Sequence, residues 1–494
     1  MTDWKRTKNC GELRKSDAGT IVTLNGWVNR RRDLGQLIFV DLRDRSGLVQ
    51  VVFDPELLGA EQFELAEGLR AEYVIAVQGK VAPRPEGQAN PNLPTGEVEV
   101  QATRLVILSE AETPPFPIDR AEEVDEAIRL KYRYLHLRSR ELQETIALRH
   151  RITAAVRSFL NSQGFLEIET PMLIRSTPEG ARDYVVPSRV HPGSFYALPQ
   201  SPQLFKQLLM IAGFERYYQI ARCFRDEDLR ADRQPEFTQI DVEMSFVDRE
   251  DVMATMEAMI LHVLEEVKGI KVPSPIPRLS YQEAMDRYGS DKPDTRFGME
   301  ICDLTAQLST SEFRVFSEAA AAKGVIRGIN VKGGASFTRR QIDQLSEQAQ
   351  GWGAKGLIWL AVEESQVRSP IAKFLKPEEL DAICQAMAAQ PGDLILMVAG
   401  SYELVCDVLG RLRLALGKEL GLMDEDAFNL LWVVDWPLLV YDEEAGRYVA
   451  AHHPFTAPLD EDEHLLETAP GQVRAKAYDM VLNGVELGGG SIRI

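Results

Sequence analysis

The chain of 494 residues is several times larger than one hydrophobic core, which predicts about two to four domains. Its composition, 45% hydrophobic and 27% charged, is typical of a globular protein and excludes wholesale disorder. Because 75 Asp and Glu outnumber 56 Lys and Arg, the formal net charge is −19, which argues against coating nucleic acid by bulk charge. Any polyanionic partner must therefore be bound by local basic patches.

The cysteines and the first residues bear on the compartment. Five cysteines lie far apart without a Cys-x-x-Cys pair, which disfavours a disulfide framework and a zinc knuckle: Cys10, Cys223, Cys302, Cys384 and Cys406. The start of the chain has no apolar signal-peptide core, and no run of about 18 uninterrupted apolar residues occurs. We therefore expect a cytoplasmic protein with no membrane partner.

Residues 1–108 have the pattern of a small β-barrel. From Thr20 onward three β-type runs, a helix-like stretch at 55–72 and two further β-type runs follow one another, which predicts a five-stranded OB barrel. Residues 1–50 carry ten Lys and Arg against six Asp and Glu. Charge alone leaves open whether the run Arg30-Arg31-Arg32 forms a nucleic-acid face or a solvated turn. Phe39 and Gln50, on adjacent predicted strands, favour base stacking and base-edge reading.

The rest of the chain predicts a multidomain α+β protein. A Pro-rich connector opens a hinge at 109–138, and residues 129–151 hold seven Lys and Arg against two Glu, which could contact a phosphate backbone or face water. Residues 300–425 alternate Ala-rich helices with strands and are interpreted as an inserted α+β domain, which separates 139–299 from 426–494. A P-loop and a Rossmann turn are both excluded, because Gly410–Lys418 has the wrong spacing and no G-x-G-x-x-G follows a strand.

Residues 195–246 are the most informative stretch. Ser201 and Pro202 predict an N-cap and the first turn of a helix over 202–212, which places Gln203 and Lys206 on one face. In the second of two following strands, an apolar face is expected to be core and a polar face to carry Asp241 and Glu243. A polar face opposite Arg225 is costly to bury without a charged ligand, although surface salt bridges would explain the pattern equally well.

These residues carry a resemblance to a known family. The stretch just described resembles motif 2 of class II aminoacyl-tRNA synthetases, and with STPEGARDY, AHHPFTAP and NGVELGGGSIRI it is similar to bacterial aspartyl-tRNA synthetases. GWVNRRRDLGQLIFVDLRDRSGLVQ resembles that family's anticodon-binding OB domain, and 300–425 its inserted GAD domain. The resemblance covers residues 9–494. It implies activation of L-aspartate by ATP to aspartyl-adenylate and pyrophosphate, then transfer to the 3′ end of tRNA(Asp).

The resemblance implies an aspartate site on matching residues. Glu179 would close over the amino acid, although a helix-start Glu is the alternative. The α-amino group would be held by Ser201, Gln203 and Asp241. The side-chain carboxylate would be held by Lys206 and Arg493, with help from His452 or His453; a metal role of these histidines is disfavoured because no third ligand has a known spacing. Asparagine would leave two buried cations unpaired, so the assignment depends on their not being neutralised by the protein's own acids.

The family also implies an ATP site and a metal site. Arg225 would contact the α-phosphate and the amino acid, and with Glu179 and Lys206 it is a candidate catalytic residue. The nucleotide would be bordered by Asp226, Glu227, Gln234 and Phe237, the last stacking on adenine. Asp479 and Glu486 match carboxylates that bind Mg²⁺ together with ATP phosphates. Gly488–Gly490 would allow close approach of a ligand, although a simple bulge explains them equally well.

Anticodon reading and dimerisation complete the expectations. Phe39, Gln50 and Glu99 match base-reading positions, with Arg30 and Arg32 beside them; a core position is the alternative for Phe39. Pro171 lies where motif 1 forms a homodimer interface in the family.

Two departures from the family pattern remain. The sequence ends at Ile494, before motif 3 and its γ-phosphate arginine; we expect a truncated sequence rather than a weakened fragment, because SIRI would end a sheet in mid-strand. His136 stands where relatives usually have Asp, so a tRNA contact there stays open. The alternatives are a noncatalytic tRNA-binding protein and a synthetase for asparagine. Leu34 leans towards a strict enzyme that does not charge tRNA(Asn).

Overall fold

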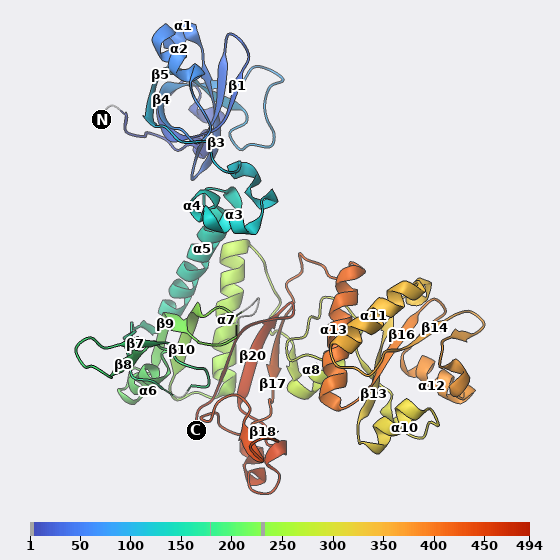
Figure 1. Ribbon diagram of the computed structural model, residues 1–494. Helices are drawn as coiled ribbons and strands as arrows, with labels where there is room; N and C mark the ends of the chain where they lie inside the picture. The colour runs from blue at the N-terminus through green and yellow to red at the C-terminus, as the bar shows by residue number, and fades with distance from the viewer. Residues whose placement is uncertain (1–3, 178, 229–232) are drawn as a thin grey trace. The chain divides into compact units, whose positions relative to one another are not determined.

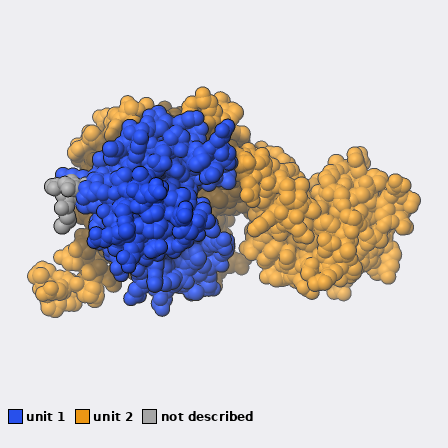
Figure 2. Space-filling view, turned by 90° about the horizontal axis from the view of Figure 1, so that it is seen from above, with its two compact units in different colours: residues 1–152 blue, residues 153–494 orange. Residues whose placement is uncertain are grey.

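The computed structural model describes residues 4–177, 179–228 and 233–494. The chain divides into two compact units, residues 1–152 and 153–494, which are coloured separately in Figure 2 and drawn as ribbons in Figure 1. Within the described residues, no helix is both long enough and apolar enough to cross a membrane.

The first unit contains a closed barrel with the strand order β1-β2-β3-β5-β4. Its strands are β1 (Ile21–Asp33), β2 (Ile38–Asp44), β3 (Gly47–Phe53), β4 (Val74–Pro83) and β5 (Val98–Ser109). In β2, buried Ile38, Val40 and Leu42 alternate with outward Phe39 and Asp41, the two-residue period of a strand with one face in a core. The predicted helix is present as α1 (Pro55–Leu58) and α2 (Ala60–Glu67). The predicted five-stranded barrel is confirmed.

The Arg30-Arg31-Arg32 run lies inside β1 and not in a turn, so the solvated-turn interpretation is wrong. The turn comes after it, at Gly35, whose φ of +86° lies in the left-handed region that favours glycine.

The segment after the barrel is helical and has a small core of its own. It contains η4 (Ile118–Glu123), α3 (Glu126–Lys131) and α4 (Arg133–His136), and leads into α5 (Arg140–Ser162). His136 is 2% exposed, and its Nε2 lies 2.6 Å from Glu122 while its Nδ1 lies 3.0 Å from Arg133. This histidine therefore packs inside the segment instead of facing solvent.

The second unit is built on two mainly antiparallel sheets. One has the order β10-β9-β6 and the other β11-β17-β20-β21. Their strands are β6 (Leu166–Glu167), β9 (Arg216–Phe224), β10 (Glu236–Met244), β11 (Arg278–Ser280), β17 (Leu430–Val434), β20 (Ala477–Leu482) and β21 (Val485–Ser491). Helix α7 (Arg249–Lys268) lies beside β20 in Figure 1 and buries Met253 against Trp432 and Met480.

One face assignment from the sequence is wrong. On β10, Asp241 is buried, whereas Ile240 is 39% exposed and Phe246, just beyond the strand, is 94% exposed. The polar face is the covered one because α6 (Gln203–Ile211) packs on β9 and β10 and presents Lys206 to it. A charged partner removes the cost that an isolated buried carboxylate would carry.

The inserted part is a five-stranded sheet covered by helices on both faces (Figure 1). The sheet has the order β12 (Cys302–Asp303), β13 (Val325–Val331), β16 (Leu394–Gly400), β14 (Ile358–Val362) and β15 (Val367–Arg368). Helices α11 (Arg339–Gly351) and α13 (Tyr402–Glu419) cover one face, and α10 (Arg314–Ala321) and α12 (Pro377–Ala386) the other. The expected α+β character is present; the exact domain boundaries stay a prediction.

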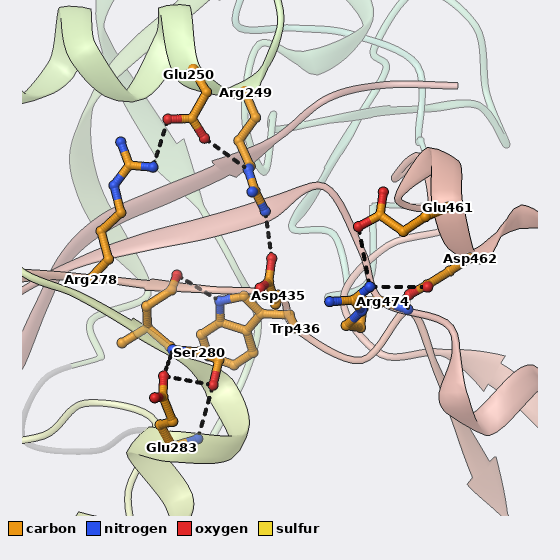
Figure 3. Close-up of polar contacts among 11 residues, drawn as sticks. Arg249, Glu250, Arg278, Ser280, Glu283, Asp435, Trp436, Glu461, Asp462 and Arg474 are labelled. Carbon is orange, nitrogen blue, oxygen red and sulfur yellow. Dashed lines mark hydrogen bonds and ion pairs between the residues drawn. The ribbon is translucent and has the colours of Figure 1, made fainter.

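A chain of ion pairs ties α7 to the second sheet (Figure 3). Arg278 of β11 contacts Glu250 at 2.6 Å, and Arg249 contacts Asp435, just after β17, at 2.7 Å. Arg249 also lies 3.5 Å from Glu250, which joins the two contacts. Asp435 has a φ of +57°, uncommon for a residue with a side chain, and the ion pair helps to hold it there.

Arg413 joins α13 to the loop that follows α8 (Tyr281–Tyr288). It is 1% exposed, its Nη2 donates to the carbonyls of Asp294, Phe297 and Gly298 at 2.8 to 2.9 Å, and it lies over the Phe297 ring. Burial lowers the pKa of Arg413 to about 10. A charged group kept in the interior must therefore be compensated by these carbonyls.

We expect Arg413→Met to lower the free energy of unfolding by roughly 3 kcal/mol, because it leaves three carbonyls without their donor. Urea denaturation checks this. The control is Arg411→Met in the same helix, whose exposed ion pair with Asp407 is worth less than about 1 kcal/mol. Equal midpoints for the two variants would contradict the assignment.

Candidate active site

Lys206 forms ion pairs with acidic side chains of the protein. Its Nζ lies 2.7 Å from Asp241 Oδ1 and 3.3 Å from Glu243 Oε2, and all three side chains are at least partly buried. Asp241 and Glu243 are two residues apart on β10 and therefore share the face that α6 covers. The expectation that Lys206 is left without an acidic partner is wrong. An ammonium has three donors, so one remains for a ligand.

Arg493, just after β21, has no such partner. Its Nη1 donates to His453 Nε2 at 2.7 Å and to Ser491, and its Nη2 to Gln203 Oε1 at 3.3 Å. Among the described residues, no carboxylate lies within ion-pair distance of Arg493. Burial first, and then the charge of Arg493, lowers the pKa of His453 to about 4, so this imidazole is neutral and can accept the hydrogen bond.

Three buried polar atoms in this region have no hydrogen-bond partner among the residues that the structure describes: Gln203 Nε2, Asp241 Oδ2 and Arg493 Nε. An unpaired buried polar atom costs about 1–3 kcal/mol. Asp241 Oδ2 is an acceptor that suits an ammonium group, and the two nitrogens are donors that suit carboxylates. A ligand that carries both kinds of group would therefore complement this region.

Glu179 and Ser201 are brought together at the edge of this region. Ser201 Oγ donates to Glu179 Oε2 at 2.7 Å, and Thr177 Oγ1 donates to Glu179 Oε1 at 2.9 Å. The prediction that Ser201 caps the helix is wrong, because Pro202 occupies the N-cap position and α6 begins at Gln203. Glu179 lies outside any helix, so the helix-start interpretation is also wrong.

The residues predicted to bind the nucleotide belong to the loop between β9 and β10 or, for Phe237, to the start of β10. The Arg225 guanidinium lies over the Phe237 ring at 5.1 Å, and no carboxylate of the described residues pairs with it. Asp226, the residue after Arg225, is one of those that line a cavity of about 330 Å³. The full lining is Gly180, Ala181, Arg182, Asp226, Glu227, Asp228 and Arg233. Gln234, which follows Arg233 in the sequence, is exposed. The arrangement leaves Arg225 available to an anion.

Asp479 and Glu486 come from neighbouring antiparallel strands, β20 and β21. Burial, and secondly the charge of Glu486, raises the pKa of Asp479 to about 7. A Cβ on Gly489 would lie 1.9 Å from Asp479 Oδ1, so only glycine leaves room for this carboxylate. The register shifts between Met480 and Val481, so a bulge is present beside these glycines. Their close approach to a ligand stays a prediction.

The two histidines have different surroundings. His453 contacts Arg493, as above, whereas His452 lies edge-on to Trp436, with 4.8 Å between the ring centres. Within the described part of the chain, no group of three or more His, Cys, Asp or Glu is arranged for a metal ion.

The predicted base-reading residues gather on the outside of the barrel. Gln50 Nε2 donates to Glu99 Oε2 at 2.8 Å, and Arg32 Nη2 donates to Gln50 Oε1 at 3.1 Å. Arg32 also lies 5.9 Å from the centre of the Phe39 ring, which is half-buried and outside the core, so the core interpretation of Phe39 is wrong. Arg30 is exposed on the same strand. Burial raises the pKa of Glu99.

Sequence reasoning missed several partners of these residues. Asp41 pairs with Arg32 at 2.9 Å, and Lys292 pairs with Glu486 at 3.0 Å. For the loop that carries Lys292, the signal available in the sequence was its run of charged residues between Gly289 and the Phe297-Gly298 pair.

Comparison with known proteins identifies the family. The model of class II tRNA synthetases (D, K and N) matches residues 125–494, and that of the OB-fold nucleic acid binding domain matches residues 22–108. The chain belongs to the class II tRNA synthetases. This synthetase is 59% identical over 491 residues to an aspartate–tRNA ligase of Bacillus licheniformis, covering 99% of this chain and 83% of the relative. It is 60% identical to an aspartate–tRNA(Asp/Asn) ligase of Caldanaerobacter subterraneus, with the same coverage.

Solved structures have the same fold as this synthetase at low sequence identity. An aspartyl-tRNA synthetase from Entamoeba histolytica has a TM-score of 0.56 and 18% identity, and covers 100% of this chain and 79% of its own. An asparaginyl-tRNA synthetase from Pyrococcus horikoshii, complexed with asparaginyl-adenylate, has a TM-score of 0.51 and 20% identity, and covers 82% and 95%. Similarity at this level supports the expected fold class, a class II catalytic domain with an OB barrel.

We expect His453 to stay neutral until the pH falls to about 4, whereas an ordinary histidine is half-protonated near pH 6.5. Because the folded pKa is below the unfolded value, its contribution to stability is lost as the pH falls from about 6.5 to 4. NMR of ¹⁵N-labelled histidine measures the titration. Arg493→Met should raise this pKa by removing a neighbouring positive charge; an unchanged value would contradict the contact.

Proposed function

We propose that this class II tRNA synthetase is an aspartate–tRNA ligase that forms aspartyl-adenylate and AMP and charges tRNA(Asp) in the cytoplasm. The observation that carries the proposal is identity of about 59% to aspartate–tRNA ligases over 99% of the chain. The site supplies a physical reason for the amino acid, because Arg493 is a half-buried cation with no acidic partner among the described residues.

The aspartate would be oriented by charge at both ends. Its α-ammonium would be accepted by Asp241 Oδ2, with Ser201 and Gln203 nearby, and Glu179 would close over it. Its side-chain carboxylate would accept hydrogen bonds from the Arg493 guanidinium and from the third donor of Lys206. His453 would keep Arg493 in position by accepting a hydrogen bond from it. Asparagine offers no anion to Arg493, and this difference supports discrimination against it.

Activation would consist of attack by the aspartate α-carboxylate on the α-phosphorus of ATP, with pyrophosphate leaving. The nucleophile is already ionised, so the protein contributes mainly positioning and neutralisation of charge. Arg225 would meet the α-phosphate, and Phe237 would stack on adenine next to it. Asp226, Glu227 and Gln234 would border the nucleotide. The 3′-terminal hydroxyl of tRNA would then attack the adenylate carbonyl and release AMP.

Asp479 and Glu486 would hold Mg²⁺ together with ATP phosphates. The residues fit, because a buried carboxyl whose pKa is raised to about 7 beside a second carboxylate is stabilised by a bound cation. When bound, Mg²⁺ supplies neutralisation of the phosphate charge.

The barrel would read the anticodon. Phe39 offers an aromatic face, and Gln50 and Glu99 offer amide and carboxylate edges held in place by Arg32. Arg30, exposed nearby, would meet a phosphate.

A homodimer through the segment around Pro171 is part of the proposal. Leu173, two residues after Pro171, is 53% exposed, and a dimer formed through this segment would cover it. We also place the domains at 1–108, 109–138, 139–299, 300–425 and 426–494.

ATP–pyrophosphate exchange tests the proposal against its alternatives. We expect exchange that depends on aspartate and is negligible with asparagine. Its absence, together with retained tRNA binding, would favour a noncatalytic tRNA-binding protein, and equal exchange with asparagine would favour a synthetase for that amino acid. Charging of purified tRNA(Asp) and tRNA(Asn) decides whether both are substrates, because the relatives' names differ on this point.

We expect Arg493→Leu to lower kcat/KM for aspartate in the exchange assay by roughly 10³-fold, because the side-chain carboxylate loses its bidentate partner. The residual rate with asparagine should change by less than about tenfold. Arg447→Leu, on the exposed strand β19 (Arg447–Ala450), is the matched control and should behave as the unchanged protein. Equal losses for both amino acids would show that Arg493 does not bind the side chain.

A further inference from the structure

The loop between α8 and β12, residues 290–298, reaches the end of the site that carries Asp479 and Glu486. Lys292 Nζ lies 3.0 Å from Glu486 Oε2, with both side chains about one-third exposed. Lys292 is therefore a cation paired to one of the two carboxylates proposed to bind the metal ion.

The loop is fixed against the turn that joins β20 to β21. Asp294, 3% exposed, is held by both nitrogens of the Arg296 fork at 2.7 to 3.2 Å, and its Cβ would lie 3.2 Å from a Cβ added to Gly484 in that turn. Asn429 Nδ2 donates to the Thr295 carbonyl at 3.1 Å. The position of Lys292 is thus tied to the turn that sets Asp479 opposite Glu486.

The inserted part holds the loop from its other side. Arg413 donates to three of its carbonyls, and a Cβ on Gly417 would lie 2.6 Å from the Phe297 ring, so α13 and the loop are in close contact. Such packing leaves the loop backbone little freedom, whereas the Lys292 side chain is partly in solvent.

We propose that Lys292 is a positioning residue for the reaction: its ammonium holds Glu486 beside Asp479 before a divalent cation binds, and it adds positive charge to the nucleotide end of the site. The inference rests on the proposed function, because it takes Asp479 and Glu486 as the metal-binding carboxylates. An ammonium paired to Glu486 competes with a metal ion for that carboxylate and attracts the phosphates of ATP.

Removing the charge of Lys292 should change the affinity for a divalent cation and the affinity for ATP in opposite directions. Without Lys292, Asp479 and Glu486 attract a divalent cation more strongly, while ATP meets one positive charge fewer. A charge partly screened by solvent at this distance changes each affinity by about three- to tenfold. General disruption of the loop would instead weaken both.

The test uses the full chain with Lys292→Met and Lys292→Arg, and binding is measured without turnover. Mn²⁺ alone is titrated by electron paramagnetic resonance, and ATP is titrated in saturating Mg²⁺ by calorimetry. We expect Lys292→Met to bind Mn²⁺ about three- to tenfold more tightly and ATP three- to tenfold more weakly, with Lys292→Arg close to the unchanged protein. Lys271→Met, which removes an exposed ion pair with Glu265, is the control for loss of one surface charge.

Weakening of both ligands by Lys292→Met, or no change in either, would overturn the inference, as would an equal response of Lys271→Met. Neither titration needs catalysis, so failure of this inference is separate from failure of the proposed activity, which shows as absent aspartate-dependent exchange in the unchanged protein.

Discussion

The pairing of Lys206 with Asp241 is the contact on which the candidate aspartate site depends. A buried ion pair gains little net stability, because desolvation offsets most of the attraction, but it fixes the helix that carries the cation over the strand that carries the anion. It also satisfies only one oxygen of Asp241 and leaves Oδ2 without a partner within the described part of the chain. The pair therefore stabilises a carboxylate in the interior and still presents one of its oxygens to a ligand.

The same charges define what the site prefers. Lys206 is balanced by Asp241 and Glu243, so the ammonium of an amino acid meets net negative charge at that end. In the part of the chain that the structure describes, Arg493 has neutral partners only, including an imidazole whose pKa is too low for it to become charged near neutral pH. A zwitterion with an additional carboxylate matches both ends, whereas a neutral side chain leaves the guanidinium uncompensated. Under the proposed function, discrimination would thus follow from Arg493 alone, which has no acidic partner among the described residues, and not from the two cations that the sequence predicts.

Local sequence patterns predicted the elements well and their partners poorly. The five strands of the barrel follow from two-residue periodicity and turn residues, and α6 from its spacing, because both signals lie within a few neighbouring residues. The buried polar face of β10 was assigned to the wrong side, since which face is covered depends on α6 packing there, and Lys206 was expected to be free because its acids lie about 35 residues away. The family motifs, longer than any periodicity, brought the site residues together where spacing alone left surface salt bridges equally possible.

The barrel face resolves an apparent conflict between the charge of the chain and a polyanionic partner. A net charge of −19 repels nucleic acid at long range, so recognition must depend on groups that act at contact distance. Arg32, Gln50 and Glu99 already bond to one another on the outward face, which fixes their side-chain positions before any base arrives. A base that exchanges hydrogen bonds with this network gains little net energy when it matches and leaves buried polar groups unpaired when it does not. If the barrel reads the anticodon as proposed, the penalty for a mismatch, and not attraction by bulk charge, would make this face selective.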